Sequence, residues 1–404
     1  MSKINGGDHP GSRPHANEDA ILRALERKPH LTRQQISAVT GLSRSTVAEV
    51  VGRLLAAGAL TKGRSPSTGR GRPPHVLRRA DPPGLLLGLD FGHNHLTVAI
   101  GAPSGEILRE RTVDASIDLM PASTLDLARQ LATELLADEG SGLTEVASAA
   151  AGMPGPMSHD GVLQIPSLLG NGQITEPALA LRAIFGFPVR TVNDTMLGAY
   201  GEMHAGAAVG VDHFLFVKAS HGVGAAVVIN GQLYQGSSGL AGEIGHTRVS
   251  GATGRCRCGN VGCLETMAGI EGLVRELPAP YGPHSLNSPS VGDPVVDRVV
   301  TDAGRSVGAT LAPICNALNP SLIVTGGVLG SGHAEAFVKG VRETIDRLAQ
   351  PAIARTVEVV PAALGIRAEA VGAVLLARRE ALAGATTRLS SDDPGAEDDQ
   401  VDQP

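Results

Sequence analysis

The sequence is poor in aromatic residues: Trp is absent, and three Tyr and six Phe make up 2% of the 404 residues. Proteins that read single-stranded nucleic acid stack bases on aromatic side chains, so this composition argues against that class. No apolar run reaches the ~18 residues that a membrane helix needs, and residues 1–14 lack the apolar core of a signal peptide. We therefore expect a cytoplasmic, globular protein that makes no membrane contact.

The net charge of −6 is the difference between two unlike segments. Residues 1–80 hold 14 basic and 5 acidic side chains, a net charge of +9, whereas the remainder holds 20 basic and 35 acidic side chains, a net charge of −15. Residues 61–80 contain six basic residues and no acidic one. A basic N-terminal segment joined to an acidic body predicts a module that binds a polyanion.

The N-terminal segment has the pattern of a helix-turn-helix. Apolar residues at helical spacing predict a first helix around residues 21–25. Residues 32–35 (Thr-Arg-Gln-Gln) form a capping box that begins a second helix, which carries Ile36 and Val39 on its apolar side. Gly41 ends this helix. Two short helices joined through a Gly turn are typical of this motif.

The third helix is the predicted recognition helix, and Ser43 caps its start. Its apolar stripe, which we expect to face the core, consists of Val47, Val50, Val51, Leu54 and Leu55. The outward residues are the candidates for DNA contact: Arg44, Ser45, Thr46, Glu49 and Arg53. Because the first turn of a recognition helix usually meets base edges, Arg44 and Ser45 are the leading candidates.

A basic hairpin follows the three helices. Residues 59–61 and 76–77 are predicted strands, and residues 69–74 between them form a flexible loop small enough to enter a minor groove. Arg70 and Arg72 are the candidate contacts in this loop. Residues 17–80 are therefore predicted to be a winged helix-turn-helix, preceded by a flexible N-terminus at residues 1–16.

The body, residues 81–385, repeats one order of elements: strand hairpins followed by strand–helix units. The predicted strands are residues 84–90, 96–100, 107–112, 146–152 and 189–192, and then 214–218, 225–229 and 322–325. Helices are predicted at residues 125–139 and 196–204. This duplication predicts two α/β lobes, each with a mixed sheet, and a cleft between them. Residues 386–404, rich in acidic residues, are predicted to be a disordered tail.

Three of the four Cys residues lie within eight positions, and a His precedes them by ten. His246, Cys256, Cys258 and Cys263 make a closed set of four ligands, which predicts a structural Zn²⁺ site in a loop of residues 246–263. A disulfide is disfavoured because a cytoplasmic chain keeps thiols reduced and one Cys would be left over. Cys315 is expected to be a buried small hydrophobic residue.

Carboxylates and an amide are predicted close to this loop. Asn193 and Asp194 follow a strand, and Glu243 and Glu265 flank the candidate zinc ligands. Such groups, projecting from loops into a cleft, suit the hydroxyls of a sugar. Taken singly, each residue is better explained as a helix cap or a solvent-facing group.

Together these residues resemble the ROK family (repressors, open reading frames and kinases) from about residue 17 to residue 383. The most specific motif is Gly-Glu-Ile-Gly-His at residues 242–246, followed by Cys-x-Cys-Gly-x-x-Gly-Cys-x-Glu at residues 256–265. Further matches are Met-Pro-Gly-Pro at residues 153–156, Asn193-Asp194, and Asn-Pro at 319–320 followed by Gly-Gly at 326–327. The resemblance implies an actin-like ATPase fold of two α/β lobes.

The resemblance also implies site residues. Sugar contacts would come from Asn193, Asp194, Glu243, His246 and Glu265, and His246 would serve zinc and sugar with one ring nitrogen each. In the family's kinases, the residue that matches Asp194 is the base that takes the proton from the sugar hydroxyl. Kinases often have Pro-Asn-Leu where residues 166–168 read Pro-Ser-Leu, so Asn171 is a candidate for that contact.

The phosphate loops depart from the kinase pattern. Family kinases carry Asp-x-Gly-Gly-Thr-Lys where residues 90–95 read Asp-Phe-Gly-His-Asn-His, and Gly-Thr-Gly-x-Gly where residues 220–224 read Ser-His-Gly-Val-Gly. Both changes put bulk where phosphate oxygens would lie, so we expect neither ATP binding nor phosphoryl transfer.

The expected function is transcription regulation. A repressor would bind double-stranded operator DNA as a homodimer or homotetramer, and a sugar effector would bind its kinase-like domain. Two alternatives stay open. One is an ATP-dependent hexose kinase with a DNA-binding extension, in which Asp194 is catalytic. The other is a regulator that responds to a protein partner instead of a sugar.

Overall fold

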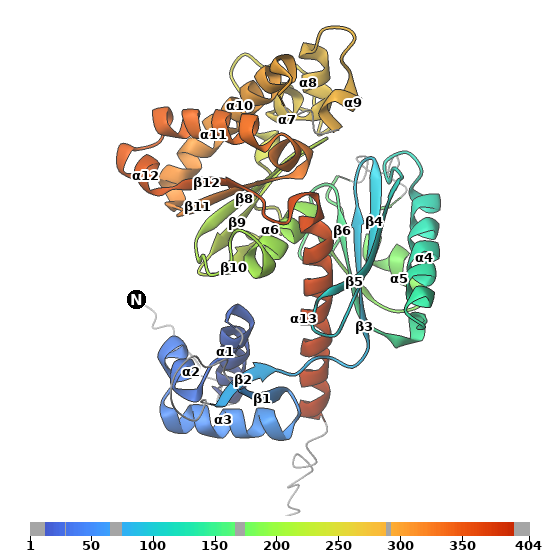
Figure 1. Cartoon of the computed structure of the whole chain (residues 1–404), viewed down its shortest axis with the longest axis vertical. Helices are drawn as coiled ribbons and strands as arrows, with labels where there is room; N and C mark the ends of the chain where they lie inside the picture. The colour runs from blue at the N-terminus through green and yellow to red at the C-terminus, as the bar shows by residue number, and fades with distance from the viewer. Residues whose placement is uncertain (1–12, 29, 65–74, 166–173, 288–291, 392–404) are drawn as a thin grey trace, which may run out of the picture. The chain divides into compact units, whose positions relative to one another are not determined.

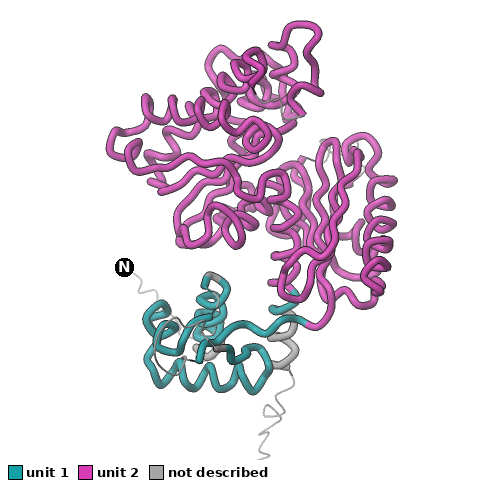
Figure 2. Tube along the Cα trace, viewed as in Figure 1, with its two compact units in different colours: residues 1–82, 381–404 teal, residues 83–380 magenta. Residues whose placement is uncertain are grey.

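The computed structural model describes residues 13–28, 30–64, 75–165, 174–287 and 292–391. The chain forms two compact units, which are residues Met1–Pro82 with Ala381–Pro404 and residues Pro83–Glu380 (Figure 2). The predicted wing residues Arg70 and Arg72, and the candidate sugar contact Asn171, lie outside the described residues.

Within the described part of residues Met1–Pro82, the N-terminal unit contains three helices and a two-stranded hairpin (Figure 1). They are α1 (Arg13–Arg27), α2 (Arg33–Thr40), α3 (Arg44–Ala56), β1 (Leu60–Arg64) and β2 (His75–Arg79). The capping box before α2 is present, because the Thr32 hydroxyl accepts from the Gln35 amide at 3.2 Å and the Gln35 side chain accepts from the Thr32 amide at 2.8 Å. Gly41, at φ +71°, ends α2, and the Ser43 hydroxyl caps α3. These local signals fix the helix-turn-helix geometry.

A small core holds this unit together. Its buried side chains are Ile21, Leu22, Leu25, Leu31, Ile36, Val47, Val50, Val51, Leu54, Leu60 and Leu77. Leu55 of the predicted stripe is only half-buried, and Val39 is 61% exposed, so the prediction that Val39 packs beside Ile36 is wrong. Helix α2 has eight residues, and Ile36 is its one buried side chain.

Two five-stranded sheets of the same design form the second unit (Figure 1). The first has the order β5-β4-β3-β6-β7, from β3 (Leu85–Phe91), β4 (His95–Gly101), β5 (Ile107–Asp114), β6 (Val146–Met153) and β7 (Val189–Asn193). Strands β3, β4 and β5 pair antiparallel, whereas β6 and β7 extend the sheet in parallel. Helices α4 (Pro121–Asp138) and α5 (Pro177–Phe185) contribute to the core of this first lobe.

The second sheet has the order β10-β9-β8-β11-β12 and repeats the same directions. Its strands are β8 (Phe214–Ala219), β9 (Val223–Ile229), β10 (Gln232–Tyr234), β11 (Leu322–Gly326) and β12 (Glu358–Pro361). The helices of this second lobe are α7 (Glu265–Ala268), α8 (Ile270–Glu276), α9 (Pro283–Asn287), α10 (Pro294–Leu318), α11 (Ala334–Leu348) and α12 (Pro351–Thr356). The predicted duplication of an actin-like fold is therefore confirmed.

Helices α6 (Asp194–Ala205) and α13 (Ala368–Ser391) pack against each other through glycines. A Cβ at Gly372 would lie 1.9 Å from the carbonyl oxygen of Leu197, and one at Gly201 would lie 2.4 Å from that of Ala368. Only hydrogen fits at these positions, so the two helix backbones come into direct contact. This packing places the first residues of both helices beside strand β8.

Two predicted boundaries differ from the structure. Helix α1 begins at Arg13, inside the predicted flexible segment, because Pro14 is compatible with the first turn of a helix. Helix α13 continues to Ser391, inside the predicted acidic tail, because residues 381–391 are rich in good helix formers and the acidic run starts only at Asp392. Among the residues that the structure describes, no helix has the length and apolarity that crossing a membrane requires.

Candidate ligand cleft and metal centre

The second unit contains a cleft that opens to solvent. The ends of strands β3, β7, β8 and β9 supply one part of its lining, and the loop before α7 supplies another. All five predicted sugar-contact residues line it, namely Asn193, Asp194, Glu243, His246 and Glu265. The structure thus brings together residues that are up to 72 positions apart in the chain.

Asn193 serves as the cap of helix α6. Its Oδ1 accepts from the amides of Thr195 at 3.0 Å and Met196 at 3.3 Å, and its Nδ2 donates to the Gly155 carbonyl at 2.9 Å. Both lone-pair positions of the amide oxygen are used, so Asn193 offers a ligand only its second N–H. Asn193 therefore caps a helix, as one of its two predicted explanations states, and it also lines the cleft.

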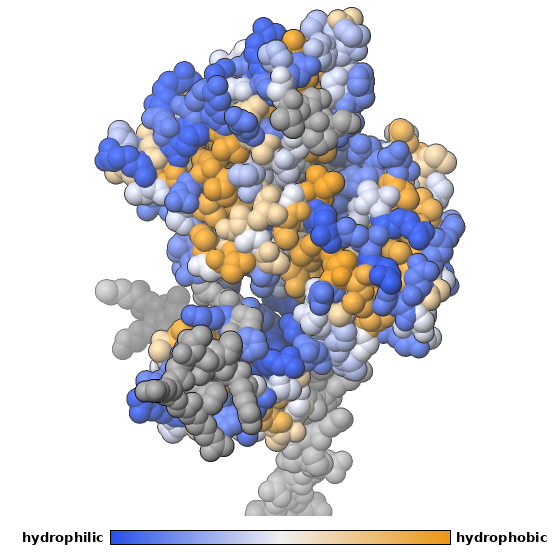
Figure 3. Space-filling view, in the orientation of Figure 1, coloured by the Kyte–Doolittle hydropathy of each residue, from blue (hydrophilic) through white to orange (hydrophobic). Residues whose placement is uncertain are grey.

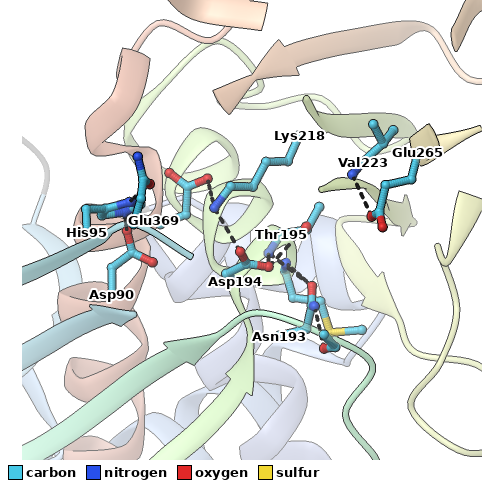
Figure 4. A network of polar contacts seen from close by, with 12 residues as sticks. Asp90, His95, Asn193, Asp194, Thr195, Lys218, Val223, Glu265 and Glu369 are labelled. Carbon is cyan, nitrogen blue, oxygen red and sulfur yellow. Dashed lines mark hydrogen bonds and ion pairs between the residues drawn. The ribbon is translucent and has the colours of Figure 1, made fainter. Parts of the chain in front are cut away.

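Asp194 is paired with a buried lysine that the sequence analysis did not identify. Its Oδ1 accepts from the Thr195 amide at 2.7 Å, and its Oδ2 accepts from Lys218 Nζ at 2.9 Å (Figure 4). The one available signal was a lysine inside the otherwise apolar run of strand β8. This ion pair holds the carboxylate that would act as the base in a kinase.

Two glutamates, Glu243 and Glu265, also line the cleft. Burial, and then the carboxylates of Asp194 and Glu265, raise the pKa of Glu243 to about 7. The Glu265 Oε2 accepts from the Val223 amide at 3.3 Å. A glutamate that titrates near neutral pH both donates and accepts hydrogen bonds, which matches the hydroxyls of a polyol.

The four predicted metal ligands form one cluster. The ligand atoms of His246, Cys256, Cys258 and Cys263 all lie within 4.8 Å of one another. Cys258 Sγ lies 3.7 Å from Cys263 Sγ, and Cys256 Sγ lies 3.5 Å from His246 Nδ1. A tetrahedral zinc ion bound to sulfur and nitrogen separates such pairs by about 3.8 and about 3.6 Å. The cluster could therefore hold a metal ion of this size.

His246 points its two ring nitrogens in different directions. Nδ1 faces the Cys256 thiol, whereas Nε2 lies 3.7 Å from the Glu243 carboxylate. This orientation suits a ring that binds a metal with one nitrogen and faces the cleft with the other. The fourth Cys, Cys315, is fully buried within helix α10, in accord with its expected role.

Imidazole rings stand at the loops that hold phosphates in the family's kinases. His95 Nε2 contacts Asp90 Oδ2 at 3.0 Å, and His93 Nδ1 contacts Asp118 Oδ2 at 2.7 Å. A Cβ at Gly92 would lie only 2.2 Å from the His95 ring. Arg257, between two of the cluster's Cys residues, also reaches Asp118 at 3.2 Å. Asp118 was not identified from the sequence because its partners are distant in the chain.

The candidate DNA contacts on α3 differ in how exposed they are and in whether other side chains already bind them. Arg44 and Ser45 are exposed, and Arg44 has no ion-pair partner among the described residues, whereas Thr46 is half-buried with its hydroxyl 2.8 Å from that of Ser43. Arg53 instead pairs with Glu18 of α1 at 3.1 Å and with the exposed Glu49 at 2.7 Å. Arg53 therefore links two helices, and Arg44 is the basic side chain of α3 that stays available to a phosphate or base.

Comparison with known proteins identifies the family. The model of the ROK family matches residues 86–380, and the model of the MarR family matches residues 20–71. The chain belongs to the ROK family. It is 27% identical over 391 residues to a putative xylose repressor of Caldicellulosiruptor sp. (strain Rt8B.4), an alignment that covers 91% of this chain and 96% of that protein.

Solved structures of ROK proteins share the fold. A ROK-family transcriptional regulator described as a homologue of the E. coli MLC protein has a TM-score of 0.73 at 22% identity, covering 94% of this chain and 99% of that one. A ROK glucokinase from Streptomyces griseus, in complex with glucose and AMPPNP, has a TM-score of 0.61 at 25% identity, covering 73% of this chain and 100% of that one. The kinase match leaves out about a quarter of this chain, whereas the regulator match spans nearly all of it.

Proposed function

We propose that this ROK protein is a transcriptional repressor that binds operator DNA through its winged helix and releases it when a sugar occupies the cleft. The observation that carries the proposal is that one chain combines a folded helix-turn-helix, with an exposed Arg44 at the start of its recognition helix, and a cleft lined by all five predicted sugar-contact residues. The similarity to a putative xylose repressor along almost the entire chain supports it. Arg70 and Arg72 are proposed as further DNA contacts.

The proposed effector is a neutral sugar or sugar derivative. Glu243, Glu265 and Asp194 offer oxygen acceptors for its hydroxyl groups, and His246 and the free N–H of Asn193 offer donors. We propose Zn²⁺ as the ion that His246, Cys256, Cys258 and Cys263 hold. Four protein ligands leave no open position for a reacting water, so zinc would supply no chemistry beyond fixing the loop that presents the contact residues.

We propose that the cleft does not phosphorylate its ligand. Lys218 occupies one oxygen of Asp194, and His93 and His221 stand where backbone amides would cradle phosphates. Burial and the nearby His93 lower the pKa of His221. The protonated form of the His221 imidazole, which could attract a phosphate, is therefore disfavoured. A base without a positioned phosphoryl donor transfers nothing.

The proposed mechanism requires at least a dimer, because a two-fold operator presents two half-sites. We propose that the protein is cytoplasmic and forms a homodimer or homotetramer. Exposed apolar side chains on the second unit support such an assembly, among them Leu119 at 82% and Ile366 at 70% exposure. Figure 3 shows apolar residues gathered on one face of this unit. Sugar binding would shift the dimer towards a state in which the spacing of its two winged helices no longer matches the operator.

The proposal is tested by incubating the purified protein with Mg²⁺-ATP and a panel of hexoses, pentoses and amino sugars while ADP release is followed. We expect no turnover above that of the Asp194→Asn variant, which serves as the matched control. Kinases typically turn over at roughly 1–100 s⁻¹. Turnover in this range that disappears in Asp194→Asn would contradict the proposal and favour a hexose kinase with a DNA-binding extension.

A further inference from the structure

The N-terminal unit carries more positive charge than its own acidic residues neutralise. Five acidic residues are described between positions 13 and 82, and four of them form ion pairs, whose partners are Arg53, Arg78 and Arg79. The fifth, Asp19, is exposed and has no ion-pair partner among the described residues. The unpaired bases of this unit, which are exposed and likewise have no such partner among the described residues, are Arg23, Lys28, Arg33, Arg44 and Lys62. The described surface therefore has a clear excess of positive charge.

The three helices of this unit add to that excess at their N-terminal ends. None of α1, α2 and α3 has an acidic residue in its first turn, although an acidic side chain there stabilises a helix. Arg33 and Arg44 are instead the first residues of α2 and α3. A basic side chain at this end reinforces the partial positive charge of the helix dipole. The unit therefore attracts a polyanion from outside its own fold.

The chain contains a polyanion of its own. Residues 392–404, which lie outside the described residues, include six acidic residues and no basic one. Apart from proline and glycine, the apolar residues of this segment are Ala396 and Val401. Such a composition offers too little apolar surface to join a core, so electrostatic contacts are the interactions open to it. Residues 81–391 hold 20 basic and 29 acidic side chains, a net charge of −9. The acidic segment is therefore complementary in charge to the N-terminal unit and is repelled by the second unit.

The acidic segment starts within reach of the unpaired bases. Helix α13 ends at Ser391, and residues Ala381–Pro404 belong to the same compact unit as residues Met1–Pro82. A compact unit on the order of 80 residues has a diameter of about 30 Å, whereas a segment the length of residues 392–404 spans up to about 45 Å when extended. Tethering gives such a segment an effective concentration in the millimolar range. A contact too weak to form between separate molecules is therefore populated within one chain.

We propose that residues 392–404 bind the unpaired bases of the N-terminal unit, with Arg44 of the recognition helix among them, and compete there with DNA. This inference rests on the proposed function, because it takes the N-terminal unit to be the DNA-binding module. The bound segment lowers the affinity for every DNA sequence by the same factor, so weak binding to non-specific DNA is suppressed while tight operator binding persists. Salt weakens the contact, since it screens the charges on both sides.

Carbodiimide crosslinking of the full-length protein without DNA tests the contact itself. The reagent joins a carboxylate to an amine only where the two touch, so Arg44→Lys places a reactive amine on the recognition helix. We expect mass spectrometry to find crosslinks between residues 392–404 and position 44, and an excess of duplex DNA to suppress them. The matched control is Arg298→Lys, which places the same amine at an exposed position of α10 in the second unit and is expected to give none.

Three crosslinking results would overturn the proposal. One is the absence of a crosslink at position 44, and another is a crosslink at position 298 that is as frequent as the one at position 44. The third comes from an equal mixture of isotope-labelled and unlabelled chains. Crosslinks that join a labelled segment to an unlabelled N-terminal unit would assign the contact to a second copy of the chain.

Truncation after Ser391 tests the competition with DNA. It is expected to tighten binding to a non-specific duplex about fivefold or more at about 50 mM salt, and less than about twofold at about 300 mM salt. The affinity of the truncated protein therefore falls more steeply with salt than that of the full chain. A variant with the six acidic residues replaced by their amides keeps the length of the segment and is expected to match the truncation.

Unchanged affinity and salt dependence after truncation would overturn the proposal. Tighter DNA binding after truncation, without crosslinks at position 44, would also overturn it, because the segment would then repel DNA from a distance. If neither protein binds any DNA, the proposed function fails instead. The crosslinks, which need no DNA, would still decide whether the segment binds the N-terminal unit.

Discussion

Replacing Cys258 with Ser is expected to lower the bound zinc to a small fraction of one ion per chain and to weaken sugar binding by about 100-fold, or about 2.7 kcal/mol. The Ser hydroxyl is a poor ligand at the distance where Cys258 Sγ faces Cys263 Sγ. A closed four-ligand zinc site contributes about 10–16 kcal/mol of binding free energy in isolated zinc fingers, so losing one ligand releases the loop. Glu243, His246 and Glu265 would then no longer be held in the cleft, and each lost charged hydrogen bond costs about 1.5–3 kcal/mol.

Elemental analysis measures the zinc, and isothermal titration with the active sugar measures the affinity. The matched control is Cys315→Ala, because Cys315 is buried in helix α10, outside the cluster. This control is expected to keep both its zinc and its sugar affinity, although it loses some stability to the small cavity. Full zinc content in Cys258→Ser would show that the set of four ligands is wrong.

Replacing Glu202 with Ala is expected to lower the free energy of unfolding of the second unit by about 3–5 kcal/mol, a large effect for one residue. Glu202 is fully buried. Its Oε2 accepts from the amides of Ala207 at 2.6 Å and Ala363 at 3.1 Å, and its Oε1 accepts from Leu364 at 2.8 Å. Truncation leaves three backbone N–H groups in part-buried positions without this partner, and the loss costs about 1–3 kcal/mol for each group that water does not reach.

Urea denaturation followed by circular dichroism measures this change. The exposed Glu276 offers a matched control, since removing a surface glutamate is expected to change the stability by no more than about 0.5 kcal/mol. If Glu202→Ala lowers the free energy of unfolding as little as Glu276→Ala does, the Glu202 carboxylate does not stabilise the segment after β12.

Local signals in the sequence predicted the parts of the fold that local interactions determine. The Thr32–Gln35 capping box, the Gly41 stop and the Ser43 cap each involve residues within a few positions of one another, and the structure contains all three. The four candidate metal ligands also lie within 18 consecutive residues, so their spacing alone indicated a cluster.

Contacts between distant segments could not be predicted in this way. Glu202 and Leu364 are 162 positions apart, and Arg257 and Asp118 are 139 apart. Arg53 looked like a free DNA contact because its partner Glu18 lies in another helix. Lys218 of β8 and Glu369 of α13 form an ion pair only because these two elements converge, and no pattern within strand β8 specifies that arrangement.

The central claim is that a sugar in the cleft controls DNA binding by the winged helix. The most direct measurement is the fluorescence anisotropy of a labelled operator, selected by the protein from random-sequence DNA, during titration with each sugar of a panel at fixed salt concentration. We expect sequence-specific binding that at least one neutral sugar weakens about tenfold or more, a coupling free energy of about 1.4 kcal/mol. Failure of the selection to give a specific sequence, or an operator affinity that no sugar changes, would contradict the account.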